Sequence, residues 1–88
     1  MNNPFDKLRK QLEEQDWPSV YFFKFICPSD PETVAKVTSL FDDQSNIAMR
    51  PSKNGNYMSI SSKEVMMSAA DVIAIYEESA KIKGVISL

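Results

Sequence analysis

The sequence predicts an α+β sandwich, in which a four-stranded antiparallel sheet carries two helices on one face and a further helix precedes the sheet. Segments with alternating apolar residues and segments with apolar residues three and four positions apart follow one another in the order helix, strand, helix, strand, strand, helix, strand. A composition of 43% hydrophobic and 25% charged residues over 88 residues is typical of one small globular domain. An Asn-Gly pair between the two consecutive strands predicts a hairpin.

The first helix is predicted at the N-terminus. Asn3 is a favourable capping residue, and Pro4 suits the first helical position. Pro18 disfavours helical geometry at the residue before it, so we expect the helix to end near Asp16. Its apolar stripe consists of Phe5, Leu8 and Leu12.

The segment SVYFFKFIC, residues 19–27, is the most apolar strand, and it belongs in the middle of the sheet because it is rich in β-branched and aromatic residues. The second helix is expected from Pro31 to Asp42, with Asp30 as its cap. The buried stripe of this helix consists of Val34, Val37, Leu40 and Phe41.

The hairpin joins NIAMRPSK to NYMSISSKEV. Asn54 and Gly55 predict a two-residue type I′ turn, because both central positions of that turn need positive φ. Pro51 has no N–H to donate, so its strand is predicted at an edge of the sheet.

The last helix is expected to begin at Ser68, which forms a capping-box-like start with Asp71. Its inward stripe consists of Ala69, Val72, Tyr76 and Ala80, and VISL closes the chain as a strand. After the first helix the order is βαββαβ, the pattern of a ferredoxin-like sandwich, and right-handed connections give the strand order 4-1-3-2. The sandwich domain covers residues 18–88, and the N-terminal helical extension covers residues 1–17.

One face of this sheet is expected to carry no crossover helix. Lys24 must reach water, so it places Phe22 and Ile26 on the open face and their alternate neighbours in the core. The same alternation places Tyr57 and Ser59 on the open face. Because an exposed apolar surface usually has a cover or a partner, we expect the N-terminal helix to lie across part of this face or along the sheet edge. A homodimer through the same face and a contact with another protein are the alternatives.

No catalytic or metal-binding signature is present. The chain has no histidine, the commonest general base and metal ligand, and its one cysteine, Cys27, is interpreted as a buried structural thiol. CPSDPET lacks the glycine and the arginine of the phosphate loop of acylphosphatases, and Asp30 and Glu32 oppose an anion at the following helix start. The adjacent acids Asp42-Asp43 and Glu77-Glu78 are interpreted as solvated surface. We expect no enzyme activity, no cofactor and no metal.

Ten basic and twelve acidic residues give a formal charge of -2, and the scattered Lys and Arg argue against nucleic acid. Phe22 and Tyr57 are nevertheless placed like the aromatic residues of RNA-recognition domains, so nucleic-acid binding through the open face stays the alternative function. No segment approaches the about 20 apolar residues of a membrane span, and none is typical of a signal peptide. We expect a cytoplasmic protein with no membrane partner.

The segments FKFICPSDPE, RPSKNGNYMSIS and IYEESAKIKGVISL resemble the YbeD-like family of small bacterial proteins, domain of unknown function family 493, over roughly residues 18–88. The most specific part is Pro51-Ser52, Gly55, Tyr57 and Ser59, followed by YEE. The resemblance implies a fold similar to ACT regulatory domains and implies no activity. Amino-acid-binding ACT domains usually carry a glycine in their first loop, which CPSDPE lacks, so no small ligand is expected.

We therefore predict a non-catalytic ACT-like regulatory or protein-interaction module, whose partner is a second copy or another protein. Arg50, Lys53 and Lys63 form either a small cationic patch for an acidic partner or three separately solvated side chains. The candidate interaction surface consists of Phe22, Lys24, Arg50, Lys53, Asn54, Tyr57 and Ser59.

Overall fold

The computed structural model describes residues 4–42 and 44–88, and its elements follow the predicted order. The strands are β1 (Ser19–Pro28), β2 (Ile47–Pro51), β3 (Tyr57–Met66) and β4 (Ile86–Ser87). The helices are α1 (Asp6–Glu13), α2 (Pro31–Thr38) and α3 (Ala69–Ala80), with the short 3-10 turn η1 (Gln44–Asn46) before β2.

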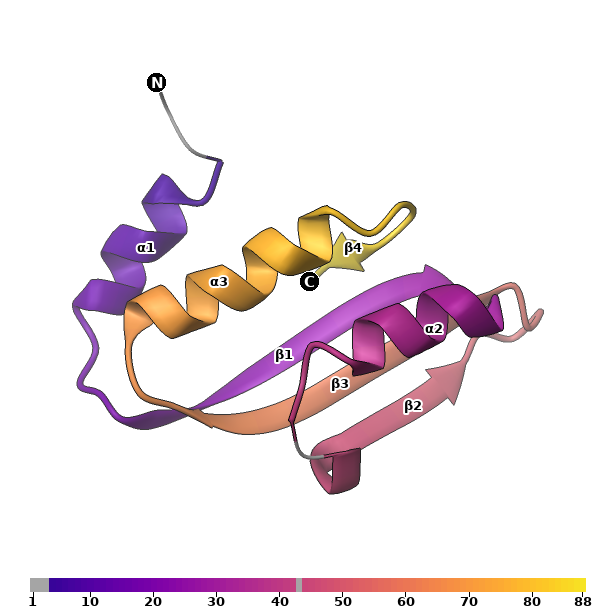
Figure 1. Cartoon of the computed structure of the whole chain (residues 1–88), viewed down its shortest axis with the longest axis horizontal. Helices are drawn as coiled ribbons and strands as arrows, with labels where there is room; N and C mark the ends of the chain where they lie inside the picture. The colour runs from indigo at the N-terminus through magenta and orange to yellow at the C-terminus, as the bar shows by residue number, and fades with distance from the viewer. Residues whose placement is uncertain (1–3, 43) are drawn as a thin grey trace.

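The strands form one antiparallel sheet in the order β2-β3-β1-β4, which is the predicted order 4-1-3-2 read from the other edge. Strand β1 is central and pairs with β3 over its whole length, from Ser19↔Met66 to Pro28↔Tyr57. Strand β2, which contains Pro51, lies at an edge as predicted. Figure 1 shows α2 and α3 together in front of the sheet, an arrangement consistent with a ferredoxin-like sandwich.

The core forms where the inward side chains of β1 meet aromatic residues of the helix layer. Phe23 and Phe25 are fully buried, whereas Phe22, the residue before Phe23, is 52% exposed, because successive strand residues face opposite sides of the sheet. The ring centroid of Phe23 lies 5.5 Å from that of Phe41 and 5.6 Å from that of Tyr76. The predicted assignment of the two faces of β1 is therefore confirmed.

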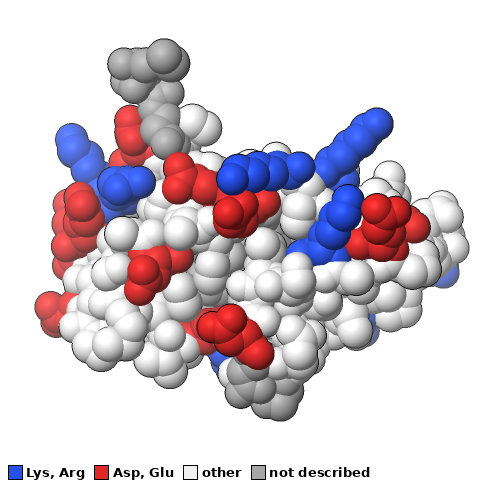
Figure 2. Space-filling view, in the orientation of Figure 1, with Lys and Arg blue, Asp and Glu red and all other residues white. Residues whose placement is uncertain are grey.

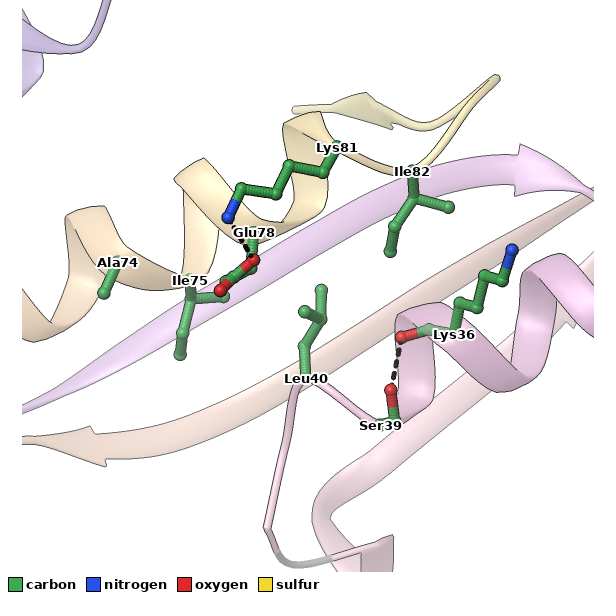
Figure 3. A pocket seen from close by; sticks show the side chains of 8 residues that line it. All are labelled: Lys36, Ser39, Leu40, Ala74, Ile75, Glu78, Lys81 and Ile82. Carbon is green, nitrogen blue, oxygen red and sulfur yellow. Dashed lines mark hydrogen bonds and ion pairs between the residues drawn. The ribbon is translucent and has the colours of Figure 1, made fainter.

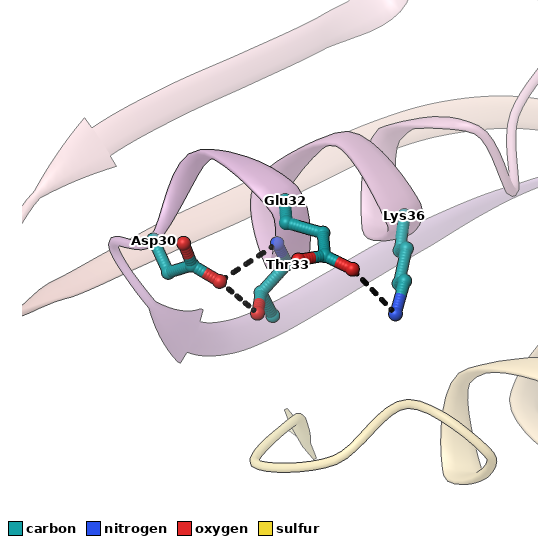
Figure 4. Close-up of polar contacts among 4 residues, drawn as sticks. All are labelled: Asp30, Glu32, Thr33 and Lys36. Atoms are coloured by element: carbon teal, nitrogen blue, oxygen red, sulfur yellow. Dashed lines mark hydrogen bonds and ion pairs between the residues drawn. The ribbon is translucent and has the colours of Figure 1, made fainter.

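Both crossover helices begin at their predicted caps. The Asp30 carboxylate accepts hydrogen bonds from the backbone N–H of Thr33 at 3.3 Å and from its hydroxyl at 3.0 Å (Figure 4). The Ser68 hydroxyl accepts one from the backbone N–H of Asp71 at 3.2 Å. Helix α2 ends at Thr38 rather than near Asp42, because the chain tightens into bonds between residues three apart, such as Phe41 N–H to Thr38 C=O at 3.2 Å.

The last inward-facing residue of α3 differs from the prediction. Ala80 is exposed, and Ser79 beside it is buried, with its hydroxyl donating to the C=O of Tyr76 at 2.7 Å. This internal bond satisfies the Ser79 hydroxyl, so a polar side chain occupies the inward position without leaving a buried donor unbonded. Gly84 then turns the chain into β4 with φ of 84°, and a Cβ at this position would lie 3.1 Å from Cγ of Pro28.

Helix α1 does not cover the open sheet face, so that part of the expectation is wrong. The helix lies beside α3 in the helix layer (Figure 1), where Leu12 is only 2% exposed and the ring of Phe5 stacks on Tyr76 with centroids 6.0 Å apart. The apolar stripe of α1 is therefore buried against α3, where Phe5 packs on Tyr76. The ring N–H of Trp17 donates to the C=O of Leu12 at 2.9 Å and fixes the chain that leads into β1.

The bounds of α1 also differ from the prediction. The helix begins at Asp6 and ends at Glu13, inside the range expected from the proline positions. Asn3, the expected cap, lies outside the described residues.

The hairpin loop is longer than the predicted two-residue turn. The backbone N–H of Ser52 bonds to the C=O of Tyr57 at 2.8 Å, so four residues, 53–56, form the loop. Gly55 has φ of 75°, whereas Asn54 does not adopt positive φ, which a type I′ turn requires. The Gly55 N–H closes a turn onto the C=O of Ser52 at 2.9 Å, and this wider loop needs only one left-handed residue.

The position of α1 predicts a large effect of Leu12→Ala. Removing this buried side chain leaves a cavity, so we expect the free energy of unfolding to fall by about 2–4 kcal/mol in urea denaturation followed by circular dichroism. Val65→Ala is the matched control, because Val65 is 68% exposed on the open face, and we expect a change within about 0.5 kcal/mol. Equal effects of the two substitutions would contradict this placement of α1.

The buried thiol predicts a pH-dependent stability. Burial raises the pKa of Cys27 and of Tyr76, and the hydrogen bond between the Tyr76 and Tyr21 hydroxyls also raises the pKa of Tyr76. Both groups are therefore neutral in the folded state at pH values where the unfolded chain ionises. The contribution of these two groups to the free energy of unfolding should be constant below the ordinary thiol pKa and should fall as the pH rises above it. Urea denaturation at a series of alkaline pH values measures this slope.

Cys27→Ala is the control for that experiment. The variant should show a shallower fall with pH but keep a residual slope from Tyr76. The native thiol should also react with a disulfide reagent at least about 100-fold more slowly than in urea, because reaction requires opening of the fold. A native reaction rate close to that of the unfolded chain would contradict the burial of Cys27.

Candidate functional site

The open face is the surface of the sheet opposite α2 and α3. Strand pairing places side chains from all four strands on it, since directly opposite residues of an antiparallel pair share a face. Several apolar side chains there are largely exposed: Val20 by 64%, Phe22 by 52%, Tyr57 by 52% and Val65 by 68%. The full set is Val20, Phe22, Lys24, Ile26 and Pro28 of β1, Tyr57, Ser59, Ser61, Lys63 and Val65 of β3, Ala48 and Arg50 of β2, and Ile86 of β4.

The charged strand residues of the open face are all cations: Lys24, Arg50 and Lys63. The strands contain one acidic residue, Glu64, which is in register with Tyr21 on the inward side and accepts a hydrogen bond from the hydroxyl of Ser62. Acidic residues gather instead on the helices, and Figure 2 shows them spread over the helix-bearing side. The open face therefore has positive charge although the whole chain has a formal charge of -2.

The ion pairs found among the described residues lie on the helices. Lys36 pairs with Glu32 at 3.4 Å, and Lys81 pairs with Glu78 at 3.1 Å (Figures 3 and 4). Within the described part of the chain no carboxylate pairs with the three open-face cations. Their charge is thus available to an acidic group from outside.

Two adjacent hollows lie in the middle of the open face. One has a volume of about 240 Å³ and is lined by residues that include Tyr57, and the other has a volume of about 380 Å³ and is lined by residues that include Phe22. Lys24, Arg50 and Ser59 line both. Ser59 lies on β3 between the strands that carry the two cations, and its short side chain leaves room for them above the sheet.

The structure brings five of the seven predicted surface residues to these hollows: Phe22, Lys24, Arg50, Tyr57 and Ser59. Lys53 and Asn54 lie in the hairpin loop and line neither hollow. Val20, Val65 and Ile86 also lie on the open face and were not part of the predicted surface. Val20 follows from the alternation in β1 and Val65 from the alternation in β3, but Ile86 required knowledge of how β4 pairs with β1.

The two exposed aromatic rings lie at opposite ends of the open face. Phe22 is in register with Lys63, which is six residues from Tyr57 along β3. At about 3.3 Å per residue this separates the two positions by about 20 Å. Consecutive bases of a single strand therefore cannot stack on both rings, as they do on the neighbouring aromatic residues of RNA-recognition domains.

A larger hollow, of about 510 Å³, is on the other side of the molecule, between α2 and the C-terminal part of α3 (Figure 3). Leu40, Ile75 and Ile82 form its apolar floor. Its charged rim residues Lys36 and Lys81 both pair with carboxylates of their own helices. This groove is a crevice between two packed helices and presents no unpaired charge to a ligand, so we place the candidate site on the open face.

Other chemical candidates find no support in the geometry. Among the described residues, no three His, Cys, Asp or Glu side chains are close enough to hold a metal ion. Asp30 caps the start of α2 with its own carboxylate, which occupies an amide that an anion would need. Asp42 is exposed, and Asp43 lies outside the described residues. None of the described helices has the length and apolar character needed to cross a bilayer.

Comparison with known proteins gives one match. A search of curated proteins and a search of solved structures each gave no significant match. The profile of a protein family described as "Protein of unknown function (DUF493)" matches residues 13–88, from the last residue of α1 to the end of β4 and Leu88. The match covers most of the chain, and the chain therefore belongs to the DUF493 family.

Proposed function

We propose that this protein is a non-catalytic interaction module whose open sheet face binds an acidic segment of another protein. The observation that carries the proposal is the combination of exposed apolar side chains with Lys24, Arg50 and Lys63, none of which is paired with a carboxylate of the described chain. Cations beside apolar surface favour a partner that offers carboxylates together with apolar residues.

A protein partner accounts for the layout of the face better than a nucleic acid does. The two aromatic rings are about 20 Å apart, and only three strand cations lie on the face, whereas non-specific nucleic-acid binding needs a concentrated positive field. An extended peptide covers about 20 Å in six residues, so one segment reaches both rings. Nucleic-acid binding is the competing outcome of the experiment below.

The proposed role is regulatory contact, as the resemblance to ACT regulatory domains implies, without a small ligand. The first loop, CPSDPE, has no glycine, and its Asp30 carboxylate is used to cap α2. Regulation then acts through the occupation of the open face by a protein segment. A second copy of the chain is the other partner that light scattering distinguishes, because a homodimer doubles the measured mass.

Selection from a random twelve-residue peptide library displayed on phage tests this function. We expect selected peptides to be enriched in Asp and Glu between apolar residues, because only such sequences complement the open face. The double variant Lys24→Gln with Arg50→Gln should weaken their binding at least about 10-fold in fluorescence anisotropy. Each cation there is unpaired before binding, so its removal does not cost the fold an ion pair.

The matched control is Lys36→Gln with Lys81→Gln, which removes the same charge from the helix side. This control should bind the selected peptides within about twofold of the unmodified protein. Equal weakening in both double variants would show a net-charge effect and would contradict the proposal. Tighter binding of a twelve-residue oligothymidine than of any selected peptide at physiological salt would support the nucleic-acid function instead.

A further inference from the structure

Strand β1 is unpaired along half of one edge. Strand β4 pairs only with Phe25 and Ile26, and the N–H of Leu88 adds one bond to the C=O of Lys24 at 2.9 Å. Figure 1 shows β4 as a short arrow at the C-terminal end of β1, with no strand beyond the N-terminal half. We call residues 19–23 the free edge. The backbone N–H and C=O groups of an unpaired strand edge are available to pair with another chain.

The direction of the backbone groups on the free edge follows from two hydrogen bonds. Lys24 C=O points toward β4, and the N–H of Ser29 bonds to Asn56 C=O, on the other side, at 3.1 Å. Backbone groups alternate between the two sides of an antiparallel strand, so those of Val20 and Phe22 point outward at the free edge. Those of Tyr21 and Phe23 point to β3.

The outward groups are largely unbonded. The hydroxyl of Ser19 donates a long bond of 3.4 Å to the C=O of Val20. Among the described residues no partner reaches the N–H of Val20 or either backbone group of Phe22. These groups are two donors and an acceptor at the spacing of a β-ladder, which is the pattern that an added strand satisfies.

The side chains beside the free edge indicate the chemistry of that strand. Val20 and Phe22 are 64% and 52% exposed on the open face. Lys24 lies at one end of the free edge, and Lys63 is opposite Phe22 on β3. An acidic side chain of an added strand comes within cross-strand reach of Lys24.

We propose that the acidic segment binds as an added strand: an extended peptide of the partner pairs with the free edge of β1 and continues the line of β4. This inference rests on the proposed function and specifies how the partner is held. The apolar residues of this added strand cover Val20 and Phe22, and a carboxylate beside them faces Lys24. The part of the segment outside the added strand lies across the open face and contacts Arg50 and Tyr57.

A peptide fits the free edge better than a second copy of the chain does. On the helix side of the sheet, the space beside the free edge is already filled. The Tyr21 and Tyr76 hydroxyls lie 3.0 Å apart there, and the ring of Phe5 stacks on Tyr76. A second copy paired through β1 would bring its own α1 and α3 to the same space. A peptide brings only a strand.

Amide hydrogen exchange measured by NMR tests the free edge in the isolated protein. The amides of Val20 and Phe22 should exchange at least about 10-fold faster than those of Tyr21 and Phe23, which are bonded to β3. Comparable protection of all four amides would show that the edge is already paired and would overturn the proposal. Protection of Val20 and Phe22 that rises with protein concentration would show self-pairing and would overturn it as well.

The same measurement with the tightest phage-selected peptide tests strand addition. Exchange at Val20 and Phe22 should slow at least about 10-fold, while Tyr21 and Phe23 change little. A second copy of the peptide carries N-methyl groups at alternate residues, on the edge that would face β1. It keeps its side chains but loses the N–H groups that would bond to β1, so it should bind at least about 10-fold more weakly. If the peptide binds the open face and neither effect is seen, strand addition is wrong and the proposed function stands. If no peptide is selected, both fail.

Val20→Pro gives an independent check. Proline removes an N–H that the isolated protein leaves unbonded, at an edge position where proline is tolerated, so the melting temperature should change little. Peptide binding should weaken at least about 10-fold, because the substitution removes a ladder donor. Unchanged affinity in a folded Val20→Pro protein would overturn the proposal, and a variant that does not fold leaves the exchange measurements as the deciding test.

Discussion

The burial of Phe23 and Phe25 under the helix layer is the constraint on which the rest of this structure depends. Both side chains are fully buried, and their rings pack against Phe41, which follows α2, and against Tyr76 of α3. Strand residues alternate between faces, so this burial forces Phe22 onto the opposite side. It also sets the place of α1, because the ring of Tyr76 extends the core to where Phe5 can stack on it. The core and the open face are thus two results of one packing requirement.

The same requirement separates the charges of the molecule. Carboxylates occupy the solvent side of the helices, where two lysines pair with them, and the open face keeps cations beside apolar side chains. Strand β4 is too short to cover β1, so an apolar strand retains an unpaired edge of five residues, 19–23. Such an edge can pair with a strand of another chain. Pro18 and Lys24 lie at its two ends, and proline and lysine at a strand edge discourage further pairing. An edge that is short and bounded in this way favours a selected partner over aggregation.

Much of the fold could be predicted from local patterns. The alternation in β1, the caps Asp30 and Ser68 and the edge position of Pro51 were all correct, because each depends on the chemistry of a few consecutive residues. The errors arose where distant packing decided the outcome. The end of α2, the inward Ser79 and the position of α1 each depend on what lies across the core. The hairpin loop differed because the strand register left four residues to be closed by a loop, where Asn-Gly alone predicts two.

The candidate surface shows the same division. Lys24 identified the outward face of its own strand from the sequence alone, because a lone ammonium group in an apolar strand must reach water. The sequence by itself thus determined the elements, their order and which residues of each strand face outward, since these are properties of short segments. Only the tertiary structure decided that Arg50 and Ser59 meet Lys24, that α1 leaves the open face uncovered and that β1 keeps a free edge, because these depend on strand register and on contacts between residues far apart in the chain.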